Sequence, residues 1–159
     1  RNGLAFADAE LNVGVAFAPP LIRRVRSETL PDREVIIDAP PGVSCPAVAA
    51  VMDSDVIVLV TEPTPFGFHD FALAWEAFSP IGKPMGAVIN RAGLGDDSVQ
   101  RFCKEKKIPV LAEIPFDRDI AAGYSRGEVV ASLSPELRKT FVSLRNCVRE
   151  LWSREAGHA

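Results

Sequence analysis

The sequence predicts an α/β protein with a mainly parallel sheet flanked by helices. Three observations support this fold class. Short apolar runs rich in β-branched residues recur along the chain, segments with helical periodicity separate them, and proline or glycine marks many of the boundaries. Runs without polar alternation are typical of parallel strands that helices cover on both faces. We expect at least four parallel strands, at residues 34–38, 55–60, 85–89 and 110–113.

The residues before the first predicted strand form a separate N-terminal stretch. Residues 1–17 alternate loosely between apolar and polar around Gly3 and Gly14, which predicts a short β-hairpin. Pro19-Pro20 then opens a predicted helix over about 21–27, because proline suits the first turn of a helix.

Helices are predicted between the strands and at the C-terminus. The segment 67–79 carries an apolar stripe of Phe, Leu and Trp residues, and Asp96 is a candidate N-cap for the helix that ends near residue 107. Ser134-Pro135-Glu136 has the order of a cap followed by proline, which predicts a last helix to about residue 155. Shorter helices are expected at 47–52 and 118–125.

Composition restricts the class of protein. The 159 residues carry a net charge of −3, with 47% hydrophobic and 25% charged residues, which suits one soluble domain with a core. The acidic balance argues against nucleic acid as a partner, and no apolar run has the length of a membrane span. The N-terminus does not resemble a signal peptide, and three widely spaced cysteines suit reduced thiols, so we expect a cytoplasmic protein. The first residue is Arg1, from which we expect a piece of a longer chain.

The segment 34–46 organises the rest of the chain. Its apolar run ends in Asp38, and Pro40-Pro41 and Gly42 follow, with Ser44-Cys45-Pro46 behind them. An acid at the carboxyl end of a buried parallel strand lies on the edge where open α/β sheets bind ligands, and there it can hold Mg²⁺. Asp38 as a helix-capping or loop-bracing acid and Gly42 as a simple turn glycine are the alternatives.

These residues resemble the switch II segment of the MinD/ParA class of P-loop ATPases, most closely the branch with an inserted ferredoxin-like iron–sulfur domain. Further agreement comes from Leu59-Val60-Thr61-Glu62-Pro63-Thr64-Pro65-Phe66-Gly67, Val88-Ile89-Asn90-Arg91, Ile114-Pro115-Phe116-Asp117 and Tyr124-Ser125-Arg126-Gly127. The resemblance implies a partial P-loop NTPase fold of the SIMIBI, MinD-like kind. We expect a single α/β domain over 1–159, with a stub at 1–33, the MinD-like C-terminal portion at 34–130 and a final helix at 131–159.

The resemblance also implies roles for individual residues. Asp38 would bind Mg²⁺ and act in catalysis, and Gly42 would offer its backbone N–H to a γ-phosphate. Asn90 would contact adenine, since a side-chain amide offers a donor and an acceptor together.

Other residues would complete the base side. Pro115 and Asp117 would border the base, and Arg91 could stack on it, although an exposed Arg at a strand end and an Asp that caps the next helix are equally ordinary. Thr61 and Glu62 end the second predicted strand, where bracing of the proline-rich loop is favoured over a supporting role at the site. We expect Asp38, Gly42, Asn90, Pro115 and Asp117 to gather at one edge of the sheet.

The chain contains neither a Gly-rich loop ending in Gly-Lys-Ser/Thr nor a ferredoxin cysteine run. ATP and Mg²⁺ are therefore expected as cofactors only together with a phosphate loop from elsewhere, and the iron–sulfur cluster belongs to the full-length family. Two interpretations remain open: the C-terminal portion of such an ATPase, inactive by itself, or a stand-alone, non-catalytic binding or assembly module. The expected partners are an N-terminal P-loop segment, a homologous ATPase chain or a second copy of this chain.

Overall fold

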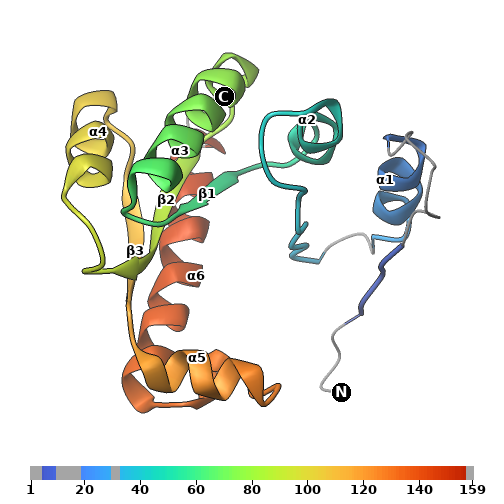
Figure 1. The fold of residues 1–159 in the computed structure, drawn as a ribbon. Coiled ribbons are helices and arrows are strands. Elements are labelled where there is room, and N and C mark those ends of the chain that lie inside the picture. The colour runs from blue at the N-terminus through green and yellow to red at the C-terminus, as the bar shows by residue number, and fades with distance from the viewer. Residues whose placement is uncertain (1–4, 10–18, 30–32, 157–159) are drawn as a thin grey trace. The chain divides into compact units, whose positions relative to one another are not determined.

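The computed structural model describes residues 5–9, 19–29 and 33–156 (Figure 1). The chain divides into two compact units, residues 1–54 and 55–159, and each is described by itself below. The single domain expected over 1–159 stays a prediction. Most of the hairpin predicted for residues 1–17 lies outside the described residues.

Two short helices pack together in the first unit. α1 (Pro19–Arg26) begins at the double proline itself, two residues before the predicted range of 21–27, and α2 (Cys45–Val51) buries Ala47 and Ala50. Arg26 joins the two helices, because its Nη1 donates to the carbonyl oxygens of Ala49 (3.2 Å) and Ala50 (3.4 Å). The same guanidinium pairs with Asp53 at 3.3 Å, just beyond the end of α2. A cation from α1 thus satisfies the last carbonyls of α2, where a helix has no partners of its own.

The predicted strand at 34–38 is wrong. Residues 34–40 have no regular secondary structure, and the side chains of Val35 and Ile36 are 47% and 97% exposed. An apolar, β-branched run becomes a strand only when a neighbouring strand pairs with its backbone N–H and C=O groups. In the part of the chain that the structure describes, no strand pairs with these residues.

The second unit contains a three-stranded parallel sheet. Its strands are β1 (Ile57–Thr61), β2 (Met85–Ala92) and β3 (Val110–Pro115), in the order β1-β2-β3. Leu59 pairs with Ala87 in the first ladder and Val88 pairs with Ala112 in the second. Three of the four predicted strands are therefore confirmed in position, and all three are parallel.

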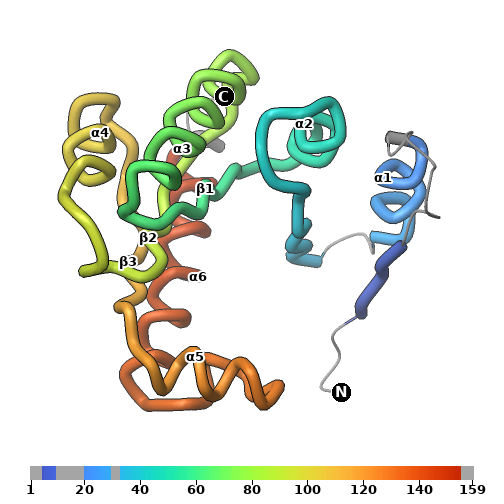
Figure 2. The backbone as a smooth tube through the Cα atoms, viewed as in Figure 1, coloured from blue at the N-terminus to red at the C-terminus, as the bar shows by residue number. Residues whose placement is uncertain are grey.

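Helices cover both faces of this sheet, which confirms the predicted fold class. α3 (Pro65–Phe78) contacts β1, and α6 (Pro135–Ala156) crosses the opposite face against β3 and β2 (Figures 1 and 2). The remaining elements are α4 (Ser98–Lys106), α5 (Arg118–Ser125) and two 3₁₀ turns, η1 (Ser79–Ile81) and η2 (Val130–Ser132). None of the helices in the described ranges combines the length and hydropathy needed to cross a bilayer.

An aromatic cluster joins α3 to α4. The ring of Phe102 meets those of Phe68, Phe71 and Trp75 edge to face, with centroid distances of 5.7, 5.8 and 5.7 Å. The largest fully buried side chains are Ile89, on β2, and Val99 and Cys103, on α4. The predicted apolar stripe on α3 is therefore core at Phe71 and Phe78, whereas its Leu73 is 41% exposed. The aromatic packing fixes both helices that follow the ends of β1 and β2.

β1 forms one border of the sheet, and its two faces differ. Ile57, Leu59 and Thr61 are buried, whereas Val58 and Val60 alternate with them and are 37% and 66% exposed. One face of β1 is thus packed and the other is left open within this unit.

Candidate functional site at the carboxyl edge of the sheet

The end of β2 carries a bulge that presents two of the predicted site residues. The register with β3 shifts between Ile89 and Ala92, and Arg91 adopts a left-handed backbone conformation with φ of 51°. The backbone N–H of Arg91 donates to Oδ1 of Asn90 at 3.0 Å. Both side chains are exposed, so the bulge turns an amide and a guanidinium out of the sheet at its carboxyl edge.

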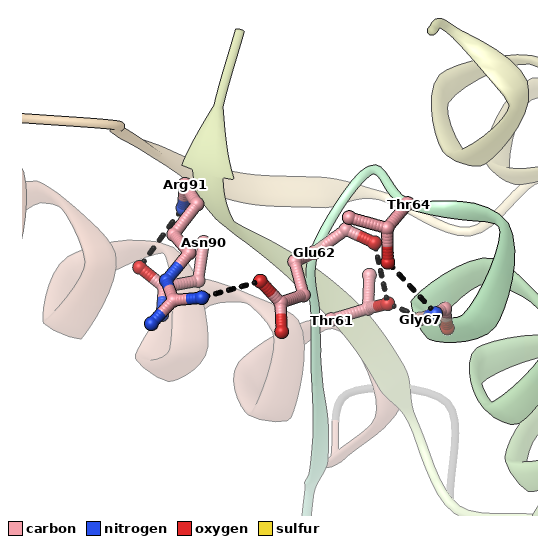
Figure 3. Close-up of polar contacts among 6 residues, drawn as sticks. All are labelled: Thr61, Glu62, Thr64, Gly67, Asn90 and Arg91. Carbon is pink, nitrogen blue, oxygen red and sulfur yellow. Dashed lines mark hydrogen bonds and ion pairs between the residues drawn. The ribbon is translucent and has the colours of Figure 1, made fainter. Parts of the chain in front are cut away.

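An ion pair connects this bulge to the end of β1. Nη1 of Arg91 lies 3.1 Å from Oε2 of Glu62, and the side chains are 57% and 40% exposed (Figure 3). Figure 3 shows Glu62 reaching from the end of β1 toward the guanidinium. Sequence reasoning favoured bracing of the proline-rich loop for Glu62, and it missed this contact. The available signal was the opposite charge of two residues that end neighbouring strands.

The loop from β1 to α3 holds the backbone of Glu62. Oγ1 of Thr61 donates to the carbonyl oxygen of Gly67 at 2.9 Å, and the N–H of Gly67 donates to Oγ1 of Thr64 at 3.1 Å. The N–H of Thr64 in turn donates to the carbonyl oxygen of Glu62 at 2.8 Å. Thr64 is thus the N-cap of α3, with Pro65 in the first turn. Bracing within this loop comes from the two threonines.

The end of β3 lies beside the end of β2. Ala92 pairs with Pro115, and the N–H of Phe116 donates to the carbonyl oxygen of Ala92 at 3.0 Å. Oδ1 of Asp117 accepts from the N–H of Asp119 at 2.7 Å and so caps α5. One edge of the sheet therefore carries Asn90, Arg91, Pro115 and Asp117. Asp117 caps the next helix, which was the alternative to a role beside the base.

Asp38 and Gly42 belong to the first unit. Asp38 is exposed, and Gly42 has φ of 79° with open space where a Cβ would stand. A left-handed φ explains why glycine occupies this turn. The expected gathering of these two residues with Asn90 stays a prediction.

The groups with a shifted pKa lie on or just before α4 and just after α5. Burial raises the pKa of the Cys103 thiol from 9.0 to about 11. Hydrogen bonds from Ser98 lower the pKa of Asp96, whose Oδ1 accepts from the N–H of Ser98 at 2.9 Å at the start of α4. Arg126, hydrogen-bonded to Glu128 at 2.6 Å, lowers the pKa of that carboxyl. Within residues 5–9, 19–29 and 33–156, no three His, Cys, Asp or Glu side chains converge as a metal site.

The fold is similar to those of two cell-division proteins of known structure. The cell division ATPase MinD of Pyrococcus furiosus superposes with a TM-score of 0.67 and 25% sequence identity, over 84% of this chain and 59% of that chain. The fold is MinD-like. The MinD cell division protein of Aquifex aeolicus, at 17% identity and a TM-score of 0.59, agrees at the level of fold.

Sequence comparison finds curated relatives of unassigned function. The uncharacterized protein MJ0579 of Methanocaldococcus jannaschii is 33% identical over 93 residues, which cover 58% of this chain and 31% of that protein. The uncharacterized ATP-binding protein MJ0169 of the same organism is 34% identical over 92 residues, 54% of this chain and 34% of that protein. The chain thus spans about a third of the length of these relatives. No family model matches it. These similarities support a MinD/ParA-like class, and the nearer resemblance to the iron–sulfur branch stays a prediction.

Proposed function

We propose that the chain is the portion of a MinD/ParA-like ATPase that carries switch II and the base side of a nucleotide site. In this proposal Asn90 reads the edge of adenine, Arg91 stacks on it, and Pro115 and Asp117 border it. The observation that carries the proposal is the MinD-like sheet whose β2 and β3 bring these four residues to one carboxyl edge.

The residues at this edge suit a purine. Asn90 offers an exposed amide, Arg91 an exposed planar cation, and Phe116 a ring that is 47% exposed. Planar cations and aromatic rings stack on a base, and an amide hydrogen-bonds its edge. The described geometry therefore fits the base side of ATP.

The same residues do not form a phosphate cradle. A P-loop surrounds the β- and γ-phosphates with backbone N–H groups and a lysine, and this chain has no Gly-Lys-Ser/Thr loop. Lys106, at the end of α4, lies over the Trp75 ring instead, with its Nζ 5.3 Å from the ring centroid. In the proposal the phosphate loop comes from further sequence of the same protein or from a partner ATPase chain, which can be a second copy. The iron–sulfur domain of the resembling branch would also lie in that further sequence.

Switch II supplies the other half of the proposal. Asp38 would hold Mg²⁺, and Gly42 would give its N–H to the γ-phosphate once the phosphate loop is present. The chain alone is then inactive, because the main stabilisers of transition-state charge are absent from it.

Isothermal titration of the 159-residue chain with Mg-ATP tests this proposal. We expect no micromolar binding and no hydrolysis by the chain alone. In a protein that adds a Gly-Lys-Thr loop, Asp38→Ala should abolish Mg²⁺-dependent turnover, and Asn90→Ala should mainly weaken nucleotide affinity. Micromolar binding by the short chain would contradict the proposal. Full activity of both variants in the longer protein would contradict the roles assigned to Asp38 and Asn90, whereas absence of turnover in the unchanged longer protein would favour the non-catalytic binding module.

A further inference from the structure

The contact between Glu62 and Arg91 links two strand ends that are 29 residues apart in sequence. An exposed ion pair of this kind contributes little to stability, typically about 1 kcal/mol or less. Its main effect is on the orientation of Arg91. A guanidinium on a flexible side chain gains a defined direction when a carboxylate holds one of its nitrogens. At this edge the direction of Arg91 decides where a planar cation faces.

The backbone of Glu62 is held in place by the loop between β1 and α3. Its carbonyl oxygen accepts from the N–H of Thr64, and the Thr61 and Thr64 hydroxyls close the loop onto Gly67 (Figure 3). Gly67 fits closely here, because a Cβ on it would overlap the Glu62 carbonyl oxygen. The carboxylate therefore projects from a braced loop.

Arg91 is in an unusual conformation for its residue type. A left-handed backbone costs a non-glycine residue about 1–2 kcal/mol, and such residues cluster where function requires them. Glycine would suit a φ of 51° better, yet an arginine stands there, paired with Glu62 and bonded through its N–H to Asn90. The side chain of Arg91 and its backbone thus connect Glu62 to the amide of Asn90.

From these contacts we infer that Glu62 is a positioning residue for base recognition. Its carboxylate orients the Arg91 guanidinium against a purine ring while the bulge presents Asn90 to the ring edge. This inference rests on the proposed function and assigns Glu62 a part in affinity for the purine.

Adenosine is the suitable probe, because it carries the base without the phosphates that this chain cannot cradle. Titration of the ¹⁵N-labelled chain by NMR should shift the Asn90 side-chain amide and the Arg91 Nε–H. Glu62→Gln should raise the Kd for adenosine roughly threefold to fivefold, in keeping with the loss of one exposed ion pair. Glu62→Asp, which keeps the charge on a shorter stem, should also weaken binding. Glu128→Gln is the matched control, because it removes another exposed ion pair, Arg126–Glu128, outside the site.

A charge swap separates positioning from simple stabilisation. Glu62→Arg combined with Arg91→Glu restores an ion pair but moves the guanidinium to the end of β1. We expect the swap to recover the free energy of unfolding and to leave adenosine binding weak.

The outcomes are distinct. Equal adenosine affinity in the unchanged chain and in Glu62→Gln, or full recovery of binding by the swap, would overturn the role of Glu62 and leave the base site standing. Absence of any adenosine shift at Asn90 and Arg91 in the unchanged chain would overturn the base side of the proposed function, and the role of Glu62 with it.

Discussion

Gly95 lies so close to Pro63 that a Cβ on Gly95 would overlap the Pro63 carbonyl oxygen. The loop after β2 therefore rests directly on the loop after β1. Pro63 is itself buried, so the contact is part of the packing at the carboxyl edge. The two loops that carry or flank Glu62 and Arg91 thus support each other through their backbones.

Gly95→Ala should destabilise the chain through this overlap. Overpacking typically costs about 1–3 kcal/mol, and here the obstacle is backbone rather than a flexible side chain. Gly93→Ala is the matched control in the same loop, because a Cβ there meets open space and only its φ of 94° is unfavourable. Urea unfolding should rank Gly95→Ala below Gly93→Ala in stability. The reverse order would mean that the Pro63 loop moves aside easily.

Phe102→Ala should weaken the packing of α4 against α3 and lower the free energy of unfolding. The Phe102 ring contacts three aromatic side chains but is only half-buried, so its removal should cost somewhat less than the roughly 3–5 kcal/mol typical of a fully buried phenylalanine. The fluorescence of Trp75 should change as well, best measured with Trp152 replaced by Phe. Phe66→Ala, at a ring that is 76% exposed, should leave the free energy of unfolding nearly unchanged. Similar losses in both variants would contradict the assigned core.

Cys103 gives stability a defined pH dependence. Burial raises its pKa from 9.0 to about 11, so the folded thiol stays protonated where the unfolded one has already ionised. The contribution is complete below pH 9, and it is lost as the pH rises through 11, by at most about 3 kcal/mol in total. Unfolding curves across this range, compared between the unchanged chain and Cys103→Ala, isolate the effect from that of lysines. Cys147→Ala should keep the same dependence of stability on pH as the unchanged chain. If Cys103→Ala also kept that dependence, the assignment to Cys103 would be wrong.

Thr64→Ala should remove the cap of α3 at a cost of about 1 kcal/mol. The lost acceptor is Oγ1, which takes the Gly67 N–H at 3.1 Å. Thr64→Ser retains the hydroxyl and should restore most of the stability. Equal loss in both variants would indicate that the methyl group, rather than the hydrogen bond, stabilises the loop.

Most of the second unit could be predicted from sequence, because its elements are specified locally. β1, β2 and β3 are apolar runs with helices between them, and the predicted helix at 118–125 matches α5. Residues 34–38 carry an equally good strand pattern, yet they form none. The pattern states a preference for extended backbone, whereas a ladder also needs a neighbour in space.

The site was predictable only in part. Strand ends identify Asn90 and Pro115, since parallel strands finish at one edge. The left-handed backbone of Arg91 has no signal in its residue type, and the Glu62 contact depends on the register between β1 and β2. The helix-capping role of Asp117 was predictable, and its hydrogen bond from the Asp119 N–H is present in the structure, whereas its role beside the base stays a prediction.

The open face of β1 has a consequence for handling the protein in solution. A sheet border with exposed valines at positions 58 and 60 and unpaired backbone groups within its own unit is a template on which another chain can extend the sheet. Concentrated samples should therefore begin to aggregate at this border. A single lysine in place of Val60 would add a charge that opposes pairing with another chain, while the buried residues of β1 stay unchanged.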